Sequence, residues 1–400
     1  MDTAPEDVDV VVVGGGIGGL ANAYALARTG QRVRVLEQEA AFGEVGAGLQ
    51  MAPNATRILR DWGLLDEVVD SGVRPRRMVM RDAVDGTELT HLDLQDAERR
   101  YGAPYIVIHR SDLHAVLVRA CADAEVDLVT GACVDDVEVS ATGGTVVSGG
   151  RRDTARVVLA ADGLQSRLRA RFSDDAPVSS GYVAYRGAVP MDDVLDIDGL
   201  AVDDVVVYIG PGCHLVQYPL RRGEMFNQVA VFRSPSSTRG EADWGTPDEL
   251  DDAFAHTCDH VRRALPSLWR DRWWPMYDRP PLSAWVDRRL ALTGDAAHPM
   301  LQYLAQGACQ ALEDADCLST EVTKQSPAAE TGTAAADMVD WDHALRTYNE
   351  VRTDRTARVQ KAARSWGELW HCDGLTRSVR NALLTDRSPT DYRHIDWLYA

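Results

Sequence analysis

The sequence predicts an α/β fold in which a helix-covered parallel sheet is interleaved with a second, mostly antiparallel sheet. The first observation is a buried-strand run, Val8 to Val13, that passes through five glycines into a helical segment. The second is a strand, Leu290 to Leu292, that runs into a tight turn and then a helix. The third is the block from Gly181 to Phe232, where strand-like runs follow one another. Alternating strands and helices are typical of a parallel sheet, whereas successive strands are typical of an antiparallel one.

Composition narrows the class of protein. Four hundred residues suggest two or three structural units. A net charge of −19 argues against a nucleic-acid partner. The uncharged stretch 10–27 is too rich in glycine for a membrane span, and no signal-peptide pattern precedes it, so we expect a cytoplasmic protein. The seven cysteines are scattered without a C-x-x-C, which predicts reduced thiols and no metal site.

The amino-terminal motif predicts a Rossmann-like dinucleotide site. Gly14, Gly16 and Gly19 fit G-x-G-x-x-G between a strand and a helix. Such glycines permit the turn, the close approach of a pyrophosphate and the packing of helix on strand. The next strand, Val33 to Leu36, ends in Glu37, at the spacing expected for an acid that binds an adenosine ribose. A ligand-free glycine loop is the alternative, and the strand, helix and acid together disfavour it.

Three further candidates for nucleotide binding follow. Gly48 lies in a glycine-rich run that lets backbone approach a ligand. Arg110 begins a predicted helix, where it could pair with a pyrophosphate or remain solvated. Asp162 and Gly163 form a turn directly after the buried strand Arg156 to Ala160.

The segment from Gly294 to Ala315 predicts a second ligand-binding turn. Asp295 lies at the carboxyl end of a strand, where α/β sheets bind ligands and a carboxylate can accept hydrogen bonds from sugar hydroxyls. The small residues Gly307 and Ala308 open the following helix, so a flat anionic ring could approach its positive amino end. An ordinary buried strand–loop–helix is the alternative.

The antiparallel block offers a candidate pocket wall. In the run HLVQYPL, His214 and Tyr218 are four residues apart and therefore share one face of an extended strand. A His–Tyr pair there could bind a phenol or a carboxylate. The alternative is a pair of surface residues on an edge strand.

The carboxyl-terminal part is expected to be helical. Arg352, Arg355 and Arg358 recur every three residues, which favours a solvated or capping face over a site. The aromatic end, HIDWLYA, is expected to dock on the core. The expected segments are an acidic helical region over Thr246–Leu265, a low-complexity linker over Lys324–Ala336 and a long helix over Asp340–Gly367.

The three motifs GGGIGG, ADG and GDAAHP, in this order, resemble the single-component FAD-dependent aromatic hydroxylases over nearly the whole chain. The resemblance implies non-covalent FAD, with Glu37 on the adenosine ribose, Arg110 on the pyrophosphate and Asp295 on the ribityl chain. It also implies that Asp162 and Gly163 serve both FAD and NAD(P)H. No second G-x-G-x-x-G exists, so NADH or NADPH is expected to bind transiently.

A narrower resemblance, to the 3-hydroxybenzoate 6-hydroxylase family, rests on HLVQYP, the LQY after GDAAHPM, and DWLY near the end. It implies that His214, Tyr218 and Gln302 line the substrate ring. The implied reaction inserts one atom of O2, by way of a C4a-hydroperoxyflavin, and converts 3-hydroxybenzoate to 2,5-dihydroxybenzoate. A histidine of ordinary, near-neutral pKa suits the proton transfer from the phenol.

Other functions remain open from the sequence. Salicylate and 6-hydroxynicotinate hydroxylases share the flavin motifs, and a flavin oxidase or reductase shares the first of them. A flavin-binding sensor is also compatible with the motifs, whereas a halogenase would need W-x-W-x-I-P, which Trp273-Trp274-Pro275 does not supply. The resemblance implies a homodimer. We expect an FAD-binding domain over 1–72, 102–178 and 280–325, a substrate domain over 73–101 and 179–279, and a helical region over 337–400.

Overall fold

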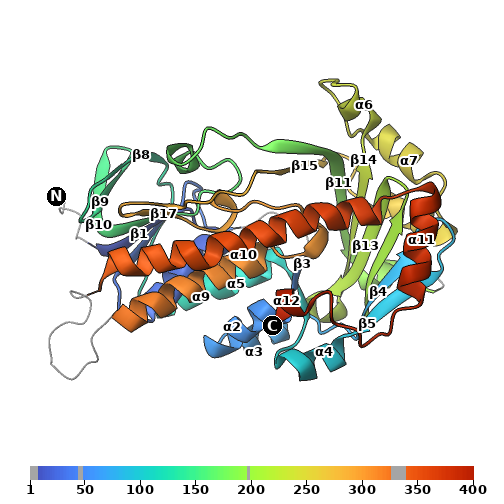
Figure 1. Ribbon diagram of the computed structural model, residues 1–400, viewed down its shortest axis with the longest axis horizontal. Helices are drawn as coiled ribbons and strands as arrows, with labels where there is room; N and C mark the ends of the chain where they lie inside the picture. The colour runs from blue at the N-terminus through green and yellow to red at the C-terminus, as the bar shows by residue number, and fades with distance from the viewer. Residues whose placement is uncertain (1–7, 44–47, 196–198, 326–338) are drawn as a thin grey trace.

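The computed structural model describes residues 8–43, 48–195, 199–325 and 339–400. These residues form two large β-sheets that lie next to each other along the molecule, and the long helix α10 runs past both (Figure 1). The expected α/β class is confirmed. Among the described residues, no helix is both long and apolar enough to cross a membrane.

The first sheet has the amino-terminal strand near its centre. Its order is β16-β17-β10-β1-β2-β7, and the hairpin β8–β9 pairs with β10. Strand β1 pairs in parallel with β10 and β2, and β10 pairs in parallel with β17. The turns that follow β1, β10 and β17 therefore meet at the same edge of the sheet. The strands are β1 (Val8–Val13), β2 (Val33–Leu36), β7 (Asp127–Val129), β8 (Val134–Val139), β9 (Gly144–Ser148), β10 (Arg151–Ala160), β16 (Val286–Asp287) and β17 (Leu290–Leu292).

The second sheet is antiparallel except for one pair. Its order is β15-β11-β14-β13-β12-β4-β5, and only β12 and β4 run parallel. A separate two-stranded ladder joins β3 to β6. The strands are β4 (Arg77–Asp82), β5 (Glu88–Asp93), β11 (Val178–Pro190), β12 (Val205–Gly210), β13 (Cys213–Leu220), β14 (Met225–Arg233) and β15 (Trp274–Asp278), with β3 (Gly48–Met51) and β6 (Ile106–His109) in the ladder.

Helices cover the first sheet and surround the second. The helices of the described residues are α1 (Ile17–Ala27), α2 (Pro53–Asp61), α3 (Leu65–Ser71), α4 (Leu94–Tyr101), α5 (Arg110–Asp123), α6 (Pro235–Thr238), α7 (Pro247–Phe254), α8 (Asp259–Ala264), α9 (Gly307–Gln325), α10 (Trp341–Trp370), α11 (Gly374–Thr385) and α12 (Asp396–Tyr399). The chain visits the first sheet, then β4 and β5, then the first sheet again, then β11 to β15, and finally β16 and β17. On this basis we propose the division into two interleaved domains and a helical region given above.

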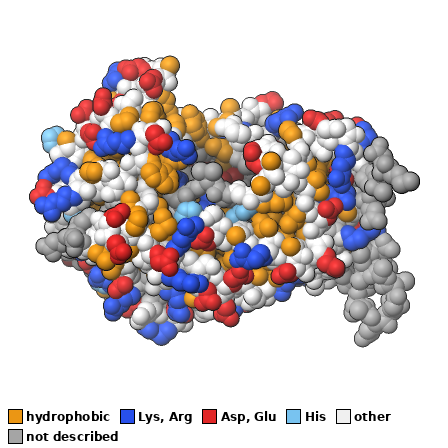
Figure 2. Space-filling model, turned by 180° about the vertical axis from the view of Figure 1, so that it is seen from behind, with side chains coloured by type: hydrophobic (Ala, Val, Ile, Leu, Met, Phe, Trp, Pro, Cys, Tyr) orange, Lys and Arg blue, Asp and Glu red, His pale blue; other side chains and the backbone are white. Residues whose placement is uncertain are grey.

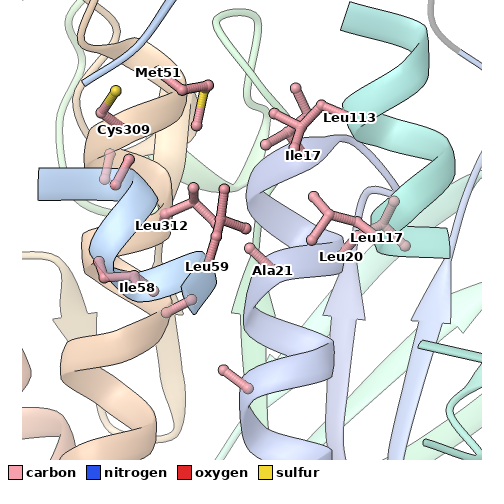
Figure 3. Packing of buried hydrophobic residues seen from close by; sticks show 14 of the residues in the cluster. Ile17, Leu20, Ala21, Met51, Ile58, Leu59, Leu113, Leu117, Cys309 and Leu312 are labelled. Carbon is pink, nitrogen blue, oxygen red and sulfur yellow. The ribbon is translucent and has the colours of Figure 1, made fainter. Parts of the chain in front are cut away.

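Helix α1 packs between α5 on one side and α2 and α9 on the other (Figure 3). Leu20 meets Leu117 of α5, while Leu59 of α2 and Leu312 of α9 lie on the opposite side. These leucines are fully buried. Each contributes about 1.5–3 kcal/mol of hydrophobic stabilisation relative to an exposed side chain, so the helices hold the β1–α1 turn rigidly.

The two faces of the second sheet have different neighbours. One face carries Tyr185, Leu215 and Phe232, which pack against Leu250 and Phe254 of α7. The opposite face looks into the cavity described below. Alternation along each strand therefore sends successive side chains to the helix layer and to the cavity.

The predicted acidic helical segment over Thr246–Leu265 is confirmed, and it consists of two helices, α7 and α8. Thr246 caps α7, which ends at Phe254, and the Thr257 hydroxyl donates to the carbonyl of Phe254 in the turn that follows. The Cys258 N–H then donates to the carbonyl of Ala83, a bond to the neighbouring sheet that starts α8 in a new direction.

Two boundaries in the carboxyl-terminal part also differ from expectation. Lys324 belongs to the end of α9, and 326–336 of the expected linker lies outside the described residues. Helix α10 continues three residues beyond Gly367, to Trp370. Its start agrees with the sequence, because the Asp340 side chain accepts the N–H of His343.

The expectation of a solvated or capping face was wrong for Arg352, which is buried. Arg352 is 2% exposed; its Nε lies 2.8 Å from Asp314 and its Nη1 2.6 Å from Glu313. Arg355 binds Glu313 as well. The two carboxylates on α9 compensate the buried guanidinium, and charge periodicity within α10 alone could not reveal partners on another helix. Arg358 lies on the exposed side, over the ring of Trp397.

The carboxyl-terminal segment docks on the core, as expected from its aromatic residues. Leu398 and Tyr399 are buried, and Arg355 donates to the carbonyls of Trp397 and Leu398. Arg355 thus connects the acidic pair on α9 to the end of the chain.

Candidate active site

A cavity of about 370 Å³ lies between the edge of the first sheet and one face of the second. Its lining combines backbone from the glycine turns with side chains from β11 to β14, the η6 turn (Gln302–Leu304), α10 and the carboxyl-terminal segment. On the face drawn in Figure 2, hydrophobic side chains gather on both sides of a central hollow. Ligand sites are typically concave and largely apolar in this way.

The β1–α1 turn is shaped for close backbone contact. Gly14 has φ +106°, and a Cβ there would lie 2.4 Å from the carbonyl oxygen of Ala161. A Cβ on Gly19 would lie 1.9 Å from the Gly14 oxygen, so only glycine lets α1 approach the turn. Gly16 lines the cavity, and Glu37 accepts the Gly15 N–H at 2.7 Å. The four predicted residues therefore meet at one turn.

A second turn carries Asp295 and leads to the amino end of α9. Gly294, Asp295, Gly307 and Ala308 all line the cavity. The Gly294 N–H donates to the buried Asp314 at 2.9 Å, which fixes the turn from beneath. Free N–H groups at the start of α9 favour negative charge in the cavity.

Of the remaining candidates for nucleotide binding, three line the cavity and one supports a turn beside it. Gly48, Arg110 and Gly163 line the cavity, and Arg110 is the first residue of α5. Asp162 turns its carboxylate inward, where one oxygen accepts the Ser166 hydroxyl at 2.6 Å and the other accepts the Arg167 N–H at 2.9 Å. Asp162 therefore shapes the turn, while Gly163 provides the surface.

These residues form a cradle that suits a dinucleotide. An ideal Cβ on Gly163 or Gly307 would meet no atom within 4 Å, so the space in front of both is open. Gly16, Gly18 and Gly294 line the same cavity and carry no side chain. A pyrophosphate requires such close backbone approach at the start of a helix.

On the sheet side, the cavity is lined by a row of cross-strand neighbours that has one arginine, Arg186, at its end. Arg186 is paired with Val229, Val229 with Val216, and Val216 with Val207, across four neighbouring strands. All four line the cavity, as does Tyr218, two residues beyond Val216. His214 lies two residues before Val216, so the predicted shared face of His214 and Tyr218 is confirmed.

Tyr218 packs directly against the glycine turn. A Cβ on Gly48 would lie 2.6 Å from the Tyr218 hydroxyl oxygen, so Gly48 makes room for the ring. Burial raises the pKa of Tyr218, and the nearby Arg186 lowers it in part. The hydroxyl is therefore neutral at physiological pH and can donate a hydrogen bond.

His214 is 1% exposed, and its Nδ1 lies 2.8 Å from Nε2 of His371, at the end of α10. Burial, together with His371, lowers the pKa of His214 well below its usual value. The expected near-neutral pKa was therefore wrong, because the sequence does not reveal how completely the ring is desolvated. A neutral imidazole faces the cavity throughout the physiological range.

Gln302 lines the cavity from the η6 turn, opposite the sheet.

The sequence did not single out Arg186, His371 or the aromatic side chains that close the site. Trp366 and Trp370 are one helical turn apart on α10, a spacing that could have signalled a shared face. Aromatic lining comes from Tyr105, Tyr303, Trp366, Trp370 and Tyr399.

Comparison with known proteins agrees with this site. Residues 7–363 match the family described as FAD binding domain. The chain is 36% identical over 405 residues to 3-hydroxybenzoate 6-hydroxylase of Polaromonas naphthalenivorans, covering 100% of this chain and 97% of the relative. It is also 36% identical to 3-amino-4-hydroxybenzoate 2-monooxygenase of Streptomyces cremeus, covering 98% and 95%. HpxO of Klebsiella pneumoniae, solved with FAD and uric acid, superposes with a TM-score of 0.81 at 26% identity, covering 95% and 93%.

Proposed function

This chain belongs to the family of single-component FAD-dependent aromatic hydroxylases, and we propose that its substrate is 3-hydroxybenzoate, hydroxylated para to the phenol. The protein is a flavoprotein monooxygenase that binds FAD non-covalently and takes electrons from NADH or NADPH. The proposed reaction consumes 3-hydroxybenzoate, O2, NAD(P)H and a proton, and yields 2,5-dihydroxybenzoate, NAD(P)⁺ and water.

The observation that carries the proposal is one cavity containing a neutral histidine, an amide and an arginine that has no carboxylate partner among the described residues. Bound FAD, held by the glycine turns, supplies the activated oxygen. In this proposal His214 takes the phenol proton, which makes the ring electron-rich. The Gln302 amide can donate a hydrogen bond to the resulting phenolate oxygen.

Arg186 supports the assignment of an aromatic acid. Arg186 lines the cavity with its guanidinium over the ring of Trp274, and among the described residues no ion pair joins it to a carboxylate. Burial lowers the pKa of Arg186, but an arginine remains protonated in proteins. A desolvated cation without an anionic partner is costly, and a substrate carboxylate would offset that cost. Tyr218, on the same face, can donate a second hydrogen bond to it.

The apolar lining supports hydroxylation rather than oxidase chemistry. Valines of the sheet and aromatic rings of α10 and the carboxyl-terminal segment surround the reacting region. Such a wall excludes water, and activated oxygen in a wet site would be lost as H2O2. The salicylate, 6-hydroxynicotinate and oxidase alternatives are outcomes of the substrate test. A homodimer and a cytoplasmic location remain predictions.

The test of the proposal is NADH and NADPH oxidation with a panel of hydroxybenzoates and identification of each product. We expect 3-hydroxybenzoate to stimulate oxidation most and to give 2,5-dihydroxybenzoate in near-stoichiometric yield. Release of CO2 from salicylate or 6-hydroxynicotinate with higher efficiency would replace this substrate assignment. Substrate consumption without a nicotinamide donor would indicate an oxidase instead.

Replacing Arg186 by methionine is expected to raise the KM for 3-hydroxybenzoate roughly tenfold or more. A hydrogen bond to a charged group contributes about 1.5–3 kcal/mol, and methionine keeps most of the apolar bulk. A neutral analogue, 3-hydroxybenzyl alcohol, should be affected far less. The measurement is steady-state kinetics with both compounds.

The exposed Arg233 at the end of β14 provides the matched control, as Arg233→Met. Its kinetic constants should equal those of the unaltered protein. An equal loss for the acid and the alcohol in Arg186→Met would show that Arg186 does not bind the carboxylate.

Replacing Asp295 by alanine is expected to weaken FAD binding roughly tenfold or more, since a charge-assisted hydrogen bond contributes about 1.5–3 kcal/mol. Asp295 lines the nucleotide side of the cavity, so the preference among ring substrates should stay unchanged. The measurement is FAD affinity by fluorescence titration, with Asp354→Ala on the exposed side of α10 as control. Wild-type affinity in Asp295→Ala would remove this residue from the FAD site.

A further inference from the structure

The histidine that meets His214 comes from a distant part of the chain and is held firmly. His371 caps the end of α10, and its ring stacks on Tyr182 of β11 with centroids 4.5 Å apart and planes 19° apart. Tyr303 meets the same ring edge-on at 5.5 Å. The His371 carbonyl accepts the N–H of Gly212 at 3.1 Å, in the turn that leads into β13. The 2.8 Å contact with His214 is therefore anchored on both sides.

Both rings of the pair are neutral at physiological pH. Burial, with Arg380 nearby, lowers the pKa of His371 to about 3. The pKa of His214 is also well below its usual value. Two neutral imidazoles share one proton across the Nδ1–Nε2 contact, because a hydrogen bond needs one donor and one acceptor. The direction of that hydrogen bond decides what His214 presents to the cavity.

We propose that His371 is a positioning residue: its Nε2 accepts the Nδ1–H of His214 and so leaves the Nε2 lone pair of His214 as the base. In this direction the proton of His371 lies on Nδ1, which has no hydrogen-bond partner among the described residues. The opposite direction would place a proton on Nε2 of His214, and that nitrogen could not then take the phenol proton. This inference rests on the proposed function, in which His214 receives that proton.

The proton balance follows from this arrangement. The phenol O–H bond breaks, its electron pair stays on the oxygen, and the proton binds Nε2 of His214. The resulting imidazolium keeps its Nδ1–H hydrogen bond to the neutral His371 and lies next to the phenolate. His371 therefore fixes the ring, sets its tautomer and stabilises the cation without contacting substrate.

The first test is the tautomer of His214 in the FAD-bound protein, measured by ¹⁵N NMR with labelled histidine and assigned with His214→Ala. We expect a protonated Nδ1 and a bare Nε2. A protonated Nε2 in the substrate-free protein would overturn the proposal. This result does not depend on which substrate is hydroxylated, so it separates a failure of this inference from a failure of the proposed function.

The second test compares two replacements of His371. Leucine cannot accept a hydrogen bond, whereas the side-chain oxygen of glutamine can reach a similar position. We expect His371→Leu to lower kcat for hydroxylation about tenfold or more with a nearly unchanged KM, and His371→Gln to recover most of that loss. FAD content and unfolding midpoint, measured for both, establish that each variant is folded.

A double-mutant cycle completes the test. If His371 acts through His214, His371→Leu should have little further effect on hydroxylation in the His214→Ala background. Additive effects of the two substitutions would overturn the proposal, as would equal losses in His371→Leu and His371→Gln.

Discussion

Replacing His214 by alanine is expected to lower the rate of hydroxylation about 100-fold or more while FAD stays bound. A positioned acid–base group typically contributes 10²–10⁴-fold, and His214 is the histidine of the cavity-facing strand β13. The aromatic neighbours of its ring are Tyr303, Trp370 and His371, and none of them is assigned to FAD. NADH oxidation is expected to continue with a larger share of H2O2, because reduction of the flavin does not require the phenolate. The measurement is product and H2O2 formed per NADH.

The control for this variant is His260→Ala. His260 stacks on Tyr208 on the opposite face of the same sheet, away from the cavity. It should leave both rate and coupling unchanged. A wild-type rate and product yield in His214→Ala would mean that the phenol loses its proton to another group.

The pH dependence separates His214 from an ordinary histidine. Because the folded-state pKa is lowered, the ring stays neutral and keeps a nitrogen free to accept a proton as pH falls through the usual histidine range. The acid limb of kcat should therefore lie well below pH 6–7. A limb near pH 6.5 that disappears in His214→Ala would show that this ring is less desolvated than its surroundings indicate.

Replacing Arg352 by methionine is expected to lower the free energy of unfolding by about 3–5 kcal/mol. Removing one partner of a buried ion pair leaves an uncompensated charge, and that loss has this size. Arg352 contacts both Asp314 and Glu313, whose carboxylates are almost wholly buried. Burial alone would raise the pKa of Asp314. The larger opposing effect of His298 and Arg352 lowers this pKa to about 2, so the carboxylate is ionised.

The Arg352→Met substitution should also disturb the FAD side of the cavity. Asp314 also holds the Gly294 N–H, and Glu313 holds Arg355, which binds the carboxyl-terminal segment. We therefore expect weaker FAD retention along with the lower stability. Chemical denaturation of Arg352→Met is compared with Arg346→Met, an exposed arginine on the same helix that should change stability by less than about 0.5 kcal/mol. If Arg352→Met were as stable as the unaltered protein, the ion pairs of Arg352 with Asp314 and Glu313 would contribute little to stability.

The sequence predicted those parts of the molecule that depend on local pattern. The run of valines before Gly14, the spacing to Glu37 and the strand before Gly294 specify elements whose order fixes a parallel sheet. Alternation on β13 likewise predicted the shared face of His214 and Tyr218. These signals are local because each element's periodicity follows from its own backbone geometry.

Contacts between distant segments could not be predicted in the same way. His371 meets His214 across 157 positions, and Arg352 meets Asp314 across 38. Nothing near either residue distinguishes a buried partner from a solvated one. The desolvation of His214, which overturned the expected pKa, likewise depends on rings brought from α10 and η6.

The parallel arrangement of β1, β10 and β17 has a consequence for how the protein is made. Strand β10 is complete on the ribosome long before β17 is synthesised, and until then its edge presents unpaired N–H and C=O groups. Pairings between such distant segments fold slowly because the intervening loop must close first. A nascent chain that has reached β10 therefore carries an open, apolar sheet edge. Lower temperature during production should favour native sheet closure over aggregation, because apolar association weakens on cooling.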